Sequence, residues 1–343
     1  MKIKPLFFSL LLFCTFFSCK QNSDPKAERL QNTVKFQGKT MGTFYSIIYI
    51  DAQKQNHQAS IDSLFEAFDF SASTYNPKSV ISRFNQNKNQ DTIEVDATFA
   101  AIFEQAKEIY QQTNGYFNPT VMPLVNYWGF GPNKTKPDLD STRVDSLKQL
   151  VNFEALSIFK KEKKHFVVRQ QKGIELDFNA IAKGYGVDLV GDFLTAKGLT
   201  DYFVEVGGEV VARGKNSRGE WWTVGINKPV ENAASREIEE VIQLENQAIA
   251  TSGNYLQFYE KDGQKFVHTI SPQTGYTVPS SLLSASIIAK DCSTADAIAT
   301  ACMVMGFEAA KGFIEGQKDL KALLIYSNER GEMSDLLIGY EAN

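Results

Sequence analysis

The sequence predicts a mixed α/β (α+β) fold, arranged as one unit with two lobes. Strand-like and helix-like segments alternate along the chain after residue 33, no Pro- or Ser-rich linker divides them, and no internal repeat is present. The chain has 343 residues, of which 43% are hydrophobic and 22% are charged. This composition is typical of a globular protein with a substantial core, and it excludes an intrinsically disordered chain.

The individual elements follow from local patterns. Segments rich in β-forming residues predict strands at residues 44–50, 202–206, 221–226, 238–244 and 283–289. Apolar residues at helical spacing predict a helix that Asp96 caps and that stops at Gly115. A second helix ends near Gly198, and a last long helix, capped by Thr294, runs through Met305.

The first 19 residues have the pattern of a signal peptide. A basic start at residues 1–4 precedes an apolar run at residues 6–17, which is shorter than the ~20 residues that span a bilayer. Residues 16–19 are similar to a bacterial lipobox, although Phe16 stands where Leu is usual. We therefore expect diacylation of Cys19, which would anchor an exported lipoprotein to a membrane on its periplasmic side. Residues 20–33 are then a polar tether, and residues 34–343 form the functional domain. The alternative, an N-terminal core helix, is disfavoured because the run has no amphipathic period.

Charge and cysteine usage narrow the function further. The net charge is −4, which excludes a broad attraction to nucleic acid; a polyanionic ligand would have to be held by a local cation or by backbone amides. No CxxC motif or Cys/His cluster is present, so a zinc site is not expected. Cys302 reads as a core residue, and a disulfide between Cys292 and Cys302 stays open.

The segment around Asp296 is the first candidate for chemistry. Asp296 and Thr300 are four residues apart, so on a helix they share one face. Both offer hard oxygen donors, and a few such donors completed by water or phosphate suit Mg²⁺. The alternative is structural: the carboxylate would stabilise the helix dipole and the hydroxyl would bond to the backbone. Taken alone, this segment favours the structural role.

A second candidate is the segment at residues 176–186, LDFNAIAKGYG, which joins an apparent strand to a helix. Asp177 is predicted at the end of the strand, and Lys183 brings a positive charge near the start of the helix. The segment lacks the spacing of a Walker A phosphate-binding loop. Alone, it would be a connector with a surface lysine.

Three further segments carry weaker signals. The glycines at residues 206–209 (VGGE) and 250–255 (ATSGNY) permit a positive φ or the close approach of a ligand, and a plain tight turn is an equal alternative. His268 begins the segment HTISPQTG and is one of only three histidines. Its neutral imidazole could take a proton from an attacking hydroxyl, although a lone histidine is more often structural.

The order of the motifs is more specific than any one of them. Further segments accompany those above, namely residues 38–43 (GKTMGT), 73–77 (STYNP), 82–85 (SRFN), 115–121 (GYFNPTV) and 128–131 (WGFG). Together, and in this order, they resemble the ApbE family of FAD:protein FMN transferases. The resemblance extends from about Phe36 to the last helix. It implies a T-fold-like architecture with a flavin cleft between two lobes.

The resemblance also implies the site. The implied FAD contacts are Met41, Tyr75, Tyr116, Phe117, Asn118, Asp177, Lys183 and Ile270. The implied Mg²⁺ ligands are Asp296, Thr300 and Ala180, the last through its carbonyl, since its side chain has no donor. The implied reaction is transfer of FMN from FAD to a Ser or Thr hydroxyl of an acceptor protein, with release of AMP. We assign His268 as the general base and Asp177 as an orienting carboxylate.

Three departures from the family pattern bear on this reaction. Asn118 and Ser271 replace usual aspartates, and Ala299 stands where some members have a further metal-binding Asp. The loss of carboxylates could weaken Mg²⁺ binding and shift the balance towards hydrolysis. The alternatives are therefore a Mg²⁺-dependent FAD pyrophosphatase, a flavin-binding lipoprotein without turnover and, least favoured, a structural lipoprotein. The family suggests flavin-carrying subunits of membrane oxidoreductases as acceptors, such as those of the sodium-pumping NADH:quinone oxidoreductase or the RNF complex.

Overall fold

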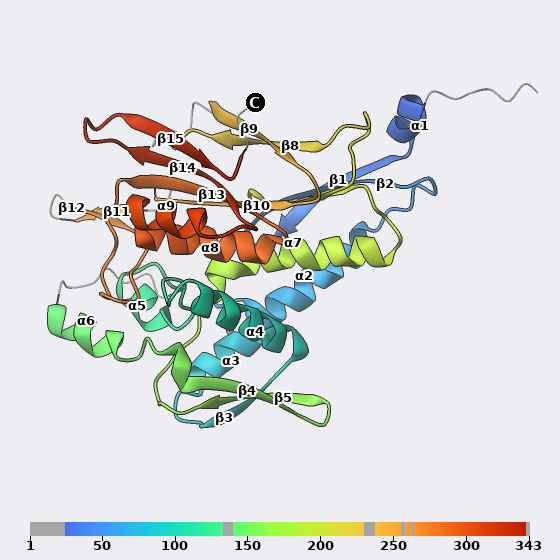
Figure 1. Ribbon diagram of the computed structural model, residues 1–343. Coiled ribbons are helices and arrows are strands. Elements are labelled where there is room, and N and C mark those ends of the chain that lie inside the picture. Colours follow the sequence, from blue (N-terminus) through green and yellow to red (C-terminus); the bar gives the residue numbers. More distant parts are fainter. Residues whose placement is uncertain (1–24, 133–139, 230–236, 255–257, 262–263, 341–343) are drawn as a thin grey trace, which may run out of the picture.

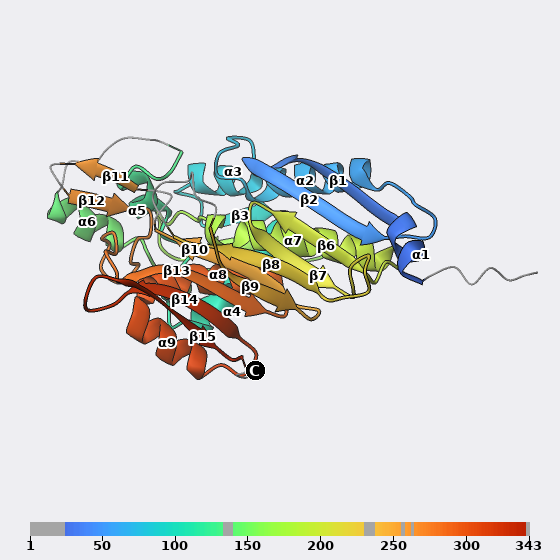
Figure 2. The same cartoon turned by 90° about the horizontal axis from the view of Figure 1, so that it is seen from above.

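An antiparallel sheet of eight strands dominates the computed structural model, which describes residues 25–132, 140–229, 237–254, 258–261 and 264–340 (Figures 1 and 2). The strands lie in the order β1-β2-β6-β7-β10-β13-β14-β15. Their bounds are β1 (Thr33–Thr40), β2 (Thr43–Ile50), β6 (Tyr202–Val206), β7 (Glu209–Arg213), β10 (Ala248–Gly253), β13 (Leu282–Ala289), β14 (Lys321–Ser327) and β15 (Met333–Ile338). Residues far apart in the chain thus meet in one sheet.

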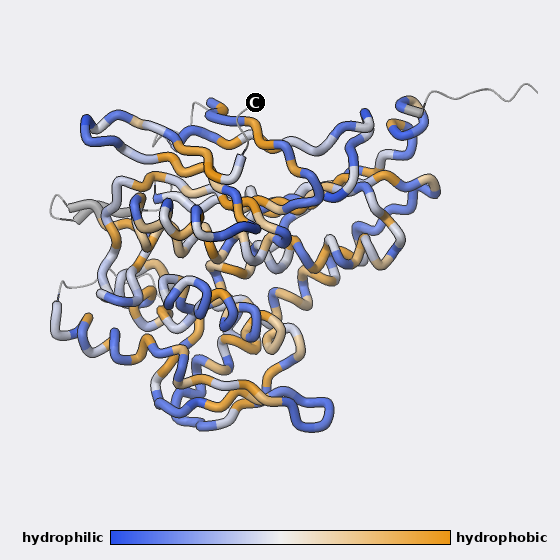
Figure 3. The backbone as a smooth tube through the Cα atoms, in the orientation of Figure 1, coloured by the Kyte–Doolittle hydropathy of each residue, from blue (hydrophilic) through white to orange (hydrophobic). Residues whose placement is uncertain are grey.

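Two layers cover the two faces of this sheet (Figure 1). On one face lies the hairpin of β8 (Trp222–Asn227) and β9 (Ile238–Leu244), whose Trp222 and Ile242 share a buried cluster with sheet residues such as Ile249. On the other face lie α7 (Asn179–Ala196) and α8 (Cys292–Met305). Helix α8 is buried almost all round, as expected of a helix packed between layers. Figure 3 shows apolar stretches along the central strands and polar residues at the tip between β4 (Leu156–Lys161) and β5 (Lys164–Arg169).

A smaller lobe lies beyond the α7–α8 layer (Figure 1). It contains a three-stranded sheet in the order β3-β5-β4 and several helices whose apolar faces join the same core as α8. The remaining elements are α1 (Pro25–Gln31), α2 (Gln58–Ala72), α3 (Val80–Gln86), β3 (Thr92–Val95), α4 (Ala97–Gln112), α5 (Met122–Tyr127), α6 (Ser141–Lys148), η1 (Phe153–Ala155), β4 (Leu156–Lys161), β5 (Lys164–Arg169), β11 (Phe258–Lys261), β12 (Gln264–Val267) and α9 (Phe307–Glu315).

Most predicted elements are confirmed. Strands β6 and β9 have the predicted bounds, and β2, β8 and β13 differ from the prediction by a residue at one or both ends. Asp96 caps α4 by accepting a hydrogen bond from the Phe99 amide at 2.7 Å. Helix α4 ends at Gln112, just before the predicted stop at Gly115, which has a φ of 76°.

Two local predictions are wrong. The cap of α8 is Asp291, whose carboxylate accepts from the Thr294 amide at 2.9 Å, so Thr294 is a donor in the first turn. No strand precedes α7 in the described segment after Arg169, so Asp177 lies in an irregular segment and not at a strand end. The pattern at residues 174–178 is apolar because Ile174, Leu176 and Phe178 are core residues.

The predicted signal peptide and Cys19 lie outside the described residues. The second half of the predicted tether forms α1 and the start of β1. Arg29 of α1 pairs with Asp201 at 3.2 Å and donates to the Lys215 carbonyl at 2.7 Å. This part of the segment is therefore attached to the domain. Within the described ranges, no helix is long and apolar enough to cross a membrane.

Candidate active site

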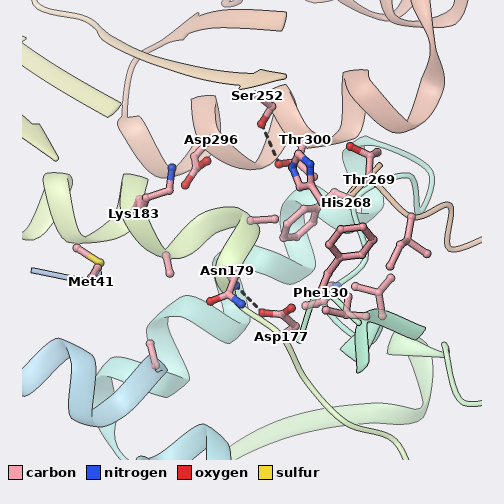
Figure 4. A pocket seen from close by; sticks show the side chains of 18 of the residues that line it. Met41, Phe130, Asp177, Asn179, Lys183, Ser252, His268, Thr269, Asp296 and Thr300 are labelled. Atoms are coloured by element: carbon pink, nitrogen blue, oxygen red, sulfur yellow. Dashed lines mark hydrogen bonds between the residues drawn. The ribbon is translucent and has the colours of Figure 1, made fainter. Parts of the chain in front are cut away.

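A cleft of about 970 Å³ lies between the α7–α8 layer and the smaller lobe, and Figure 4 looks into it. It gathers side chains from distant parts of the chain. The residues that line it include all those predicted to bind flavin or metal or to act in catalysis within the described chain: Met41, Tyr75, Tyr116, Phe117, Asn118, Asp177, Ala180, Lys183, His268, Ile270, Asp296 and Thr300. The structure thus brings these residues together, and their individual roles stay predictions.

Helix α8 supplies the oxygen donors of one wall. Asp296 is buried and Thr300 half-buried, and both line the cleft, as the four-residue spacing predicts. Thr300 Oγ1 lies 3.2 Å from the Ser252 hydroxyl of β10. The Asp296 carboxylate accepts a hydrogen bond from the backbone amide of Gly184 at 3.0 Å. A strand and two helices therefore fix the positions of these oxygens.

The bond from Gly184 affects the Ala180 carbonyl. In a regular α-helix the amide of residue 184 would donate to the carbonyl four residues earlier, which is Ala180. Here that amide donates to Asp296 Oδ2. Asp296 therefore competes for the donor that would otherwise occupy the Ala180 carbonyl, close to the start of α7. This competition favours a carbonyl oxygen available to a ligand, beside a carboxylate in the same cleft.

The charges at this wall are tightly packed. Lys183 of α7 forms an ion pair with Glu209 of β7, and its ammonium points towards Asp296 (Figure 4). Burial raises the pKa of Glu209 and of Asp296, while the Lys183 ammonium opposes both shifts. The pKa of Lys183 is raised because the attraction of Asp296 and Glu209 outweighs the effect of its burial. Lys183 therefore stays cationic in the cleft.

This set of donors fits a hydrated Mg²⁺. Asp296, Thr300 and the Ala180 carbonyl are all oxygen donors, and Mg²⁺ takes a small number of protein oxygens while keeping several waters. Among the described residues, no group of three or more His, Cys, Asp or Glu could hold a metal ion. The donors thus suit a hard cation shared with a phosphate ligand better than a softer transition metal.

Asp177 lies on the opposite side of the cleft, beside Asn179 (Figure 4). Its amide donates to the Pro119 carbonyl at 2.7 Å, which ties the start of α7 to the segment that carries Asn118. Its carboxylate accepts from the Asn179 amide at 2.8 Å. Burial raises the pKa of Asp177 to about 6.

His268 follows β12 and reaches the cleft half-buried. Its ring stands edge-on to Phe130, with the ring centroids 6.4 Å apart. The neighbouring Thr269 hydroxyl donates to the Asn254 side chain at 2.6 Å, and the Trp128 indole donates to the Gly275 carbonyl at 2.8 Å. The motifs at residues 128–131 and 268–275, distant in sequence, thus form one wall of the cleft.

Comparison with known proteins shows the family to which the chain belongs. A model of the ApbE family matches residues 41–324, a range that includes every predicted cleft residue. The chain belongs to the ApbE family. The match lies within the predicted domain at residues 34–343, and it confirms the resemblance drawn from the motifs.

Relatives in the ApbE family cover nearly the whole chain. A protein named FAD:protein FMN transferase from Vibrio cholerae is 34% identical to it, and the match covers 89% of this chain and 90% of the relative. A protein of the same name from Haemophilus influenzae is also 34% identical, and the match covers 87% of this chain and 88% of the relative. The solved flavin transferase ApbE from Vibrio cholerae is 33% identical and has a TM-score of 0.77, covering 89% of this chain and 97% of its own. The apo form of the Pseudomonas stutzeri flavinyl transferase ApbE is 27% identical and has a TM-score of 0.80, with coverages of 90% and 98%. The predicted ApbE architecture is therefore confirmed.

Two of the three positions at which the sequence predicts a departure from the ApbE pattern have a local hydrogen-bonding role. The Asn118 carbonyl oxygen accepts from the Thr120 amide at 2.9 Å and from the Thr120 hydroxyl at 2.6 Å. The Ser271 hydroxyl accepts from the Thr274 amide at 3.1 Å. An aspartate could accept the same bonds, so an asparagine or a serine at these positions keeps the turn without the negative charge of an aspartate.

The third departure lies away from the cleft. Ala299 is fully buried in the apolar core, and it does not line the cleft that Asp296 and Thr300 share. The two cysteines among the described residues are also core residues: Cys292 and Cys302 are both free and buried, so the disulfide that the sequence left open is not formed. Burial raises the pKa of the Cys302 thiol to about 12, as expected of an unreactive core cysteine.

Sequence reasoning assigned no role to Glu209, although its segment was singled out. The signal in the sequence was a charged residue directly after two glycines. In the structure both glycines have a positive φ, at 61° and 105°. Met41, which the resemblance implies as an FAD contact, also has an unusual backbone conformation. It has a φ of 47° and forms the two-residue turn between β1 and β2 with Gly42, whose φ is 72°. A bulky residue in that conformation is unusual, and here it places a thioether in the cleft.

Proposed function

We propose that this member of the ApbE family is a Mg²⁺-dependent FAD:protein FMN transferase, which joins FMN from FAD to a Ser or Thr hydroxyl of an acceptor protein and releases AMP. The observation that carries the proposal is one cleft in which hard oxygen donors and a lysine ammonium face aromatic side chains. Its volume of about 970 Å³ lies at the upper end of ligand sites, as a dinucleotide requires.

The reaction exchanges one phosphorus–oxygen bond for another. The acceptor hydroxyl attacks the FMN-side phosphorus of FAD, a new oxygen–phosphorus bond forms, and the pyrophosphate bond breaks so that AMP leaves with the bridging oxygen. Bound Mg²⁺ would neutralise the pyrophosphate and stabilise the charge that moves to AMP. Asp296, Thr300 and the Ala180 carbonyl would hold it.

The chain's own side chains have separate roles in this proposal. Lys183 provides a fixed positive charge near the phosphates. His268 accepts the proton of the attacking hydroxyl as general base. Asp177, buried and tied to the Pro119 carbonyl through its amide, orients the groups on the flavin side. Tyr75, 60% exposed at the mouth of the cleft, offers a ring face for the flavin.

The transferase reaction is tested with FAD, Mg²⁺ and a candidate acceptor subunit of an NADH:quinone oxidoreductase or RNF complex. Covalent flavin fluorescence on the acceptor in a denaturing gel, with an equal amount of AMP, is the expected result, and chelation of Mg²⁺ should abolish both. AMP release that does not depend on the acceptor would instead establish the FAD pyrophosphatase. If FAD stays intact in the presence of Mg²⁺, the protein is a flavin-binding lipoprotein without turnover.

Export and lipid anchoring are the second part of the proposal. They are supported by the basic start, the short apolar run and the Cys19 position in the sequence. Metabolic labelling with a radioactive fatty acid should mark the wild-type protein and not a Cys19→Ser variant. The variant should also leave the membrane fraction. Equal labelling of both proteins would contradict the anchor.

A further inference from the structure

Glu209 is a buried carboxylate in the cleft for which the reaction above has no role. It is the first residue of β7, directly after the Gly207–Gly208 turn, and its side chain is only 2% exposed. Its Oε2 atom is buried and, within the described part of the chain, has no hydrogen-bond partner. A buried charged group with an unpaired oxygen is destabilising, so its presence in the cleft calls for a functional reason.

The other carboxylate oxygen of Glu209 holds Lys183. Glu209 Oε1 and Lys183 Nζ form an ion pair between β7 and α7. Lys183 also points towards Asp296 (Figure 4), and both carboxylates attract it. One ammonium therefore faces two buried carboxylates, which come from two different elements.

This arrangement creates a competition at Asp296. An ammonium and a Mg²⁺ ion that are both close to one carboxylate repel each other in a buried site, so the ammonium weakens the binding of the cation there. If Asp296 is to bind a cation, Lys183 needs another carboxylate as its partner. Glu209 lies within reach of Lys183 and supplies it.

We propose that Glu209 is a positioning residue that holds the Lys183 ammonium away from Asp296 and so keeps the Asp296 carboxylate available to the cation. This inference rests on the proposed Mg²⁺ site. Direct coordination of the cation by Glu209 is disfavoured, because the ammonium already bound to its carboxylate would repel a second cation there.

The inference predicts a coupling between two substitutions. In Glu209→Gln the lysine loses its charged partner and turns to Asp296, so the affinity for the cation falls. Loss of a residue that orients a metal ligand typically reduces metal affinity about 10- to 100-fold. When Lys183 is replaced by Met, no ammonium is left to compete. Glu209→Gln should then reduce the affinity by no more than about 3-fold, through the lost long-range charge alone.

The test measures Mn²⁺ binding directly, without turnover, by titrating the full chain and following free Mn²⁺ by electron paramagnetic resonance. The four proteins are the wild type, Glu209→Gln, Lys183→Met and the double variant. Glu205→Gln is the matched control, because Glu205 accepts from the Gly208 amide in the same hairpin, outside the cleft. It should bind Mn²⁺ like the wild type. Thermal unfolding and circular dichroism verify that each variant folds.

The outcomes separate the inference from the site on which it rests. Equal losses from Glu209→Gln in the wild-type and Lys183→Met backgrounds would overturn the inference and make Glu209 a direct ligand. No loss in either background would overturn it as well. If Asp296→Ala leaves Mn²⁺ binding unchanged, the proposed metal site itself is wrong. If Glu209→Gln does not fold, Glu209→Asp, which keeps the charge on a shorter side chain, should show a smaller loss that Lys183→Met again removes.

Discussion

Replacing Gly184 with alanine should displace α8 from α7 and dismantle the oxygen set of the cleft. A Cβ atom at residue 184 would lie 2.3 Å from the Cys292 carbonyl oxygen and 2.7 Å from the Ser293 Cα, both in the backbone of α8. To restore an ordinary contact of 3.4 Å, the two helices would have to part by about 1.1 Å at this point. The bond from the Gly184 amide to Asp296, now 3.0 Å, would then stretch beyond hydrogen-bonding distance.

The energetic cost follows from these changes. Overpacking in a well-packed core costs about 1–3 kcal/mol. Loss of a hydrogen bond to the buried Asp296 carboxylate costs about 1.5–3 kcal/mol, and the higher helix propensity of alanine returns about 1 kcal/mol. We therefore expect Gly184→Ala to lower the free energy of unfolding by roughly 1.5–5 kcal/mol. It should also raise the Mg²⁺ concentration needed for half-maximal flavinylation, because Asp296 and the Ala180 carbonyl would no longer be aligned.

Urea unfolding and a Mg²⁺ titration of the flavinylation rate measure the two effects. Gly312→Ala is the matched control: Gly312 also lies within a helix, α9, but nothing lies within 4 Å of a Cβ placed there. The control should be as stable as the wild type or slightly more stable, with an unchanged Mg²⁺ requirement. If Gly184→Ala behaved like this control, the close contact of α7 with α8 would not position the site, and the reasoning would be refuted.

Three further predictions concern single side chains. Because burial raises the pKa of Asp177 from 3.8 to about 6, the folded protein keeps a proton that the unfolded chain loses, and Asp177 lowers stability as the pH rises from about 4 to 6. In Asp177→Asn, the decrease in the free energy of unfolding between pH 4 and pH 8 should be smaller by roughly 2–3 kcal/mol than in the wild type, as measured by urea unfolding at both pH values. A pH dependence equal to that of the wild type would contradict this prediction. His268→Ala should slow flavinylation about 10²- to 10⁴-fold without weakening FAD binding, whereas a near-normal rate with excess FAD and Mg²⁺ would rule out the general base. Asn118→Asp should keep both hydrogen bonds from Thr120 and alter the free energy of unfolding by less than about 1 kcal/mol. The added negative charge should lower the Mg²⁺ concentration that gives the half-maximal flavinylation rate, and an unchanged Mg²⁺ requirement would contradict this prediction.

Elements with a clear local period were predictable from the sequence. Strands β6 and β9 and the Asp96 cap of α4 are as predicted, because alternation and a capping side chain act over a few residues. The errors arose where two local solutions were equally good. Asp291 and Thr294 are both suitable caps for α8, and the apolar residues before Asp177 fit a strand as well as a buried irregular segment.

The sequence by itself determined that Asp296 and Thr300 share a helix face, because residues four apart on an α-helix always lie on the same face. It did not determine that Gly184 donates to Asp296 or that Glu209 binds Lys183. Gly184 and Asp296 are 112 residues apart, and their contact depends on how closely α7 and α8 pack. Only the tertiary structure decides that distance, because it is set by the packing of whole layers and not by any local pattern.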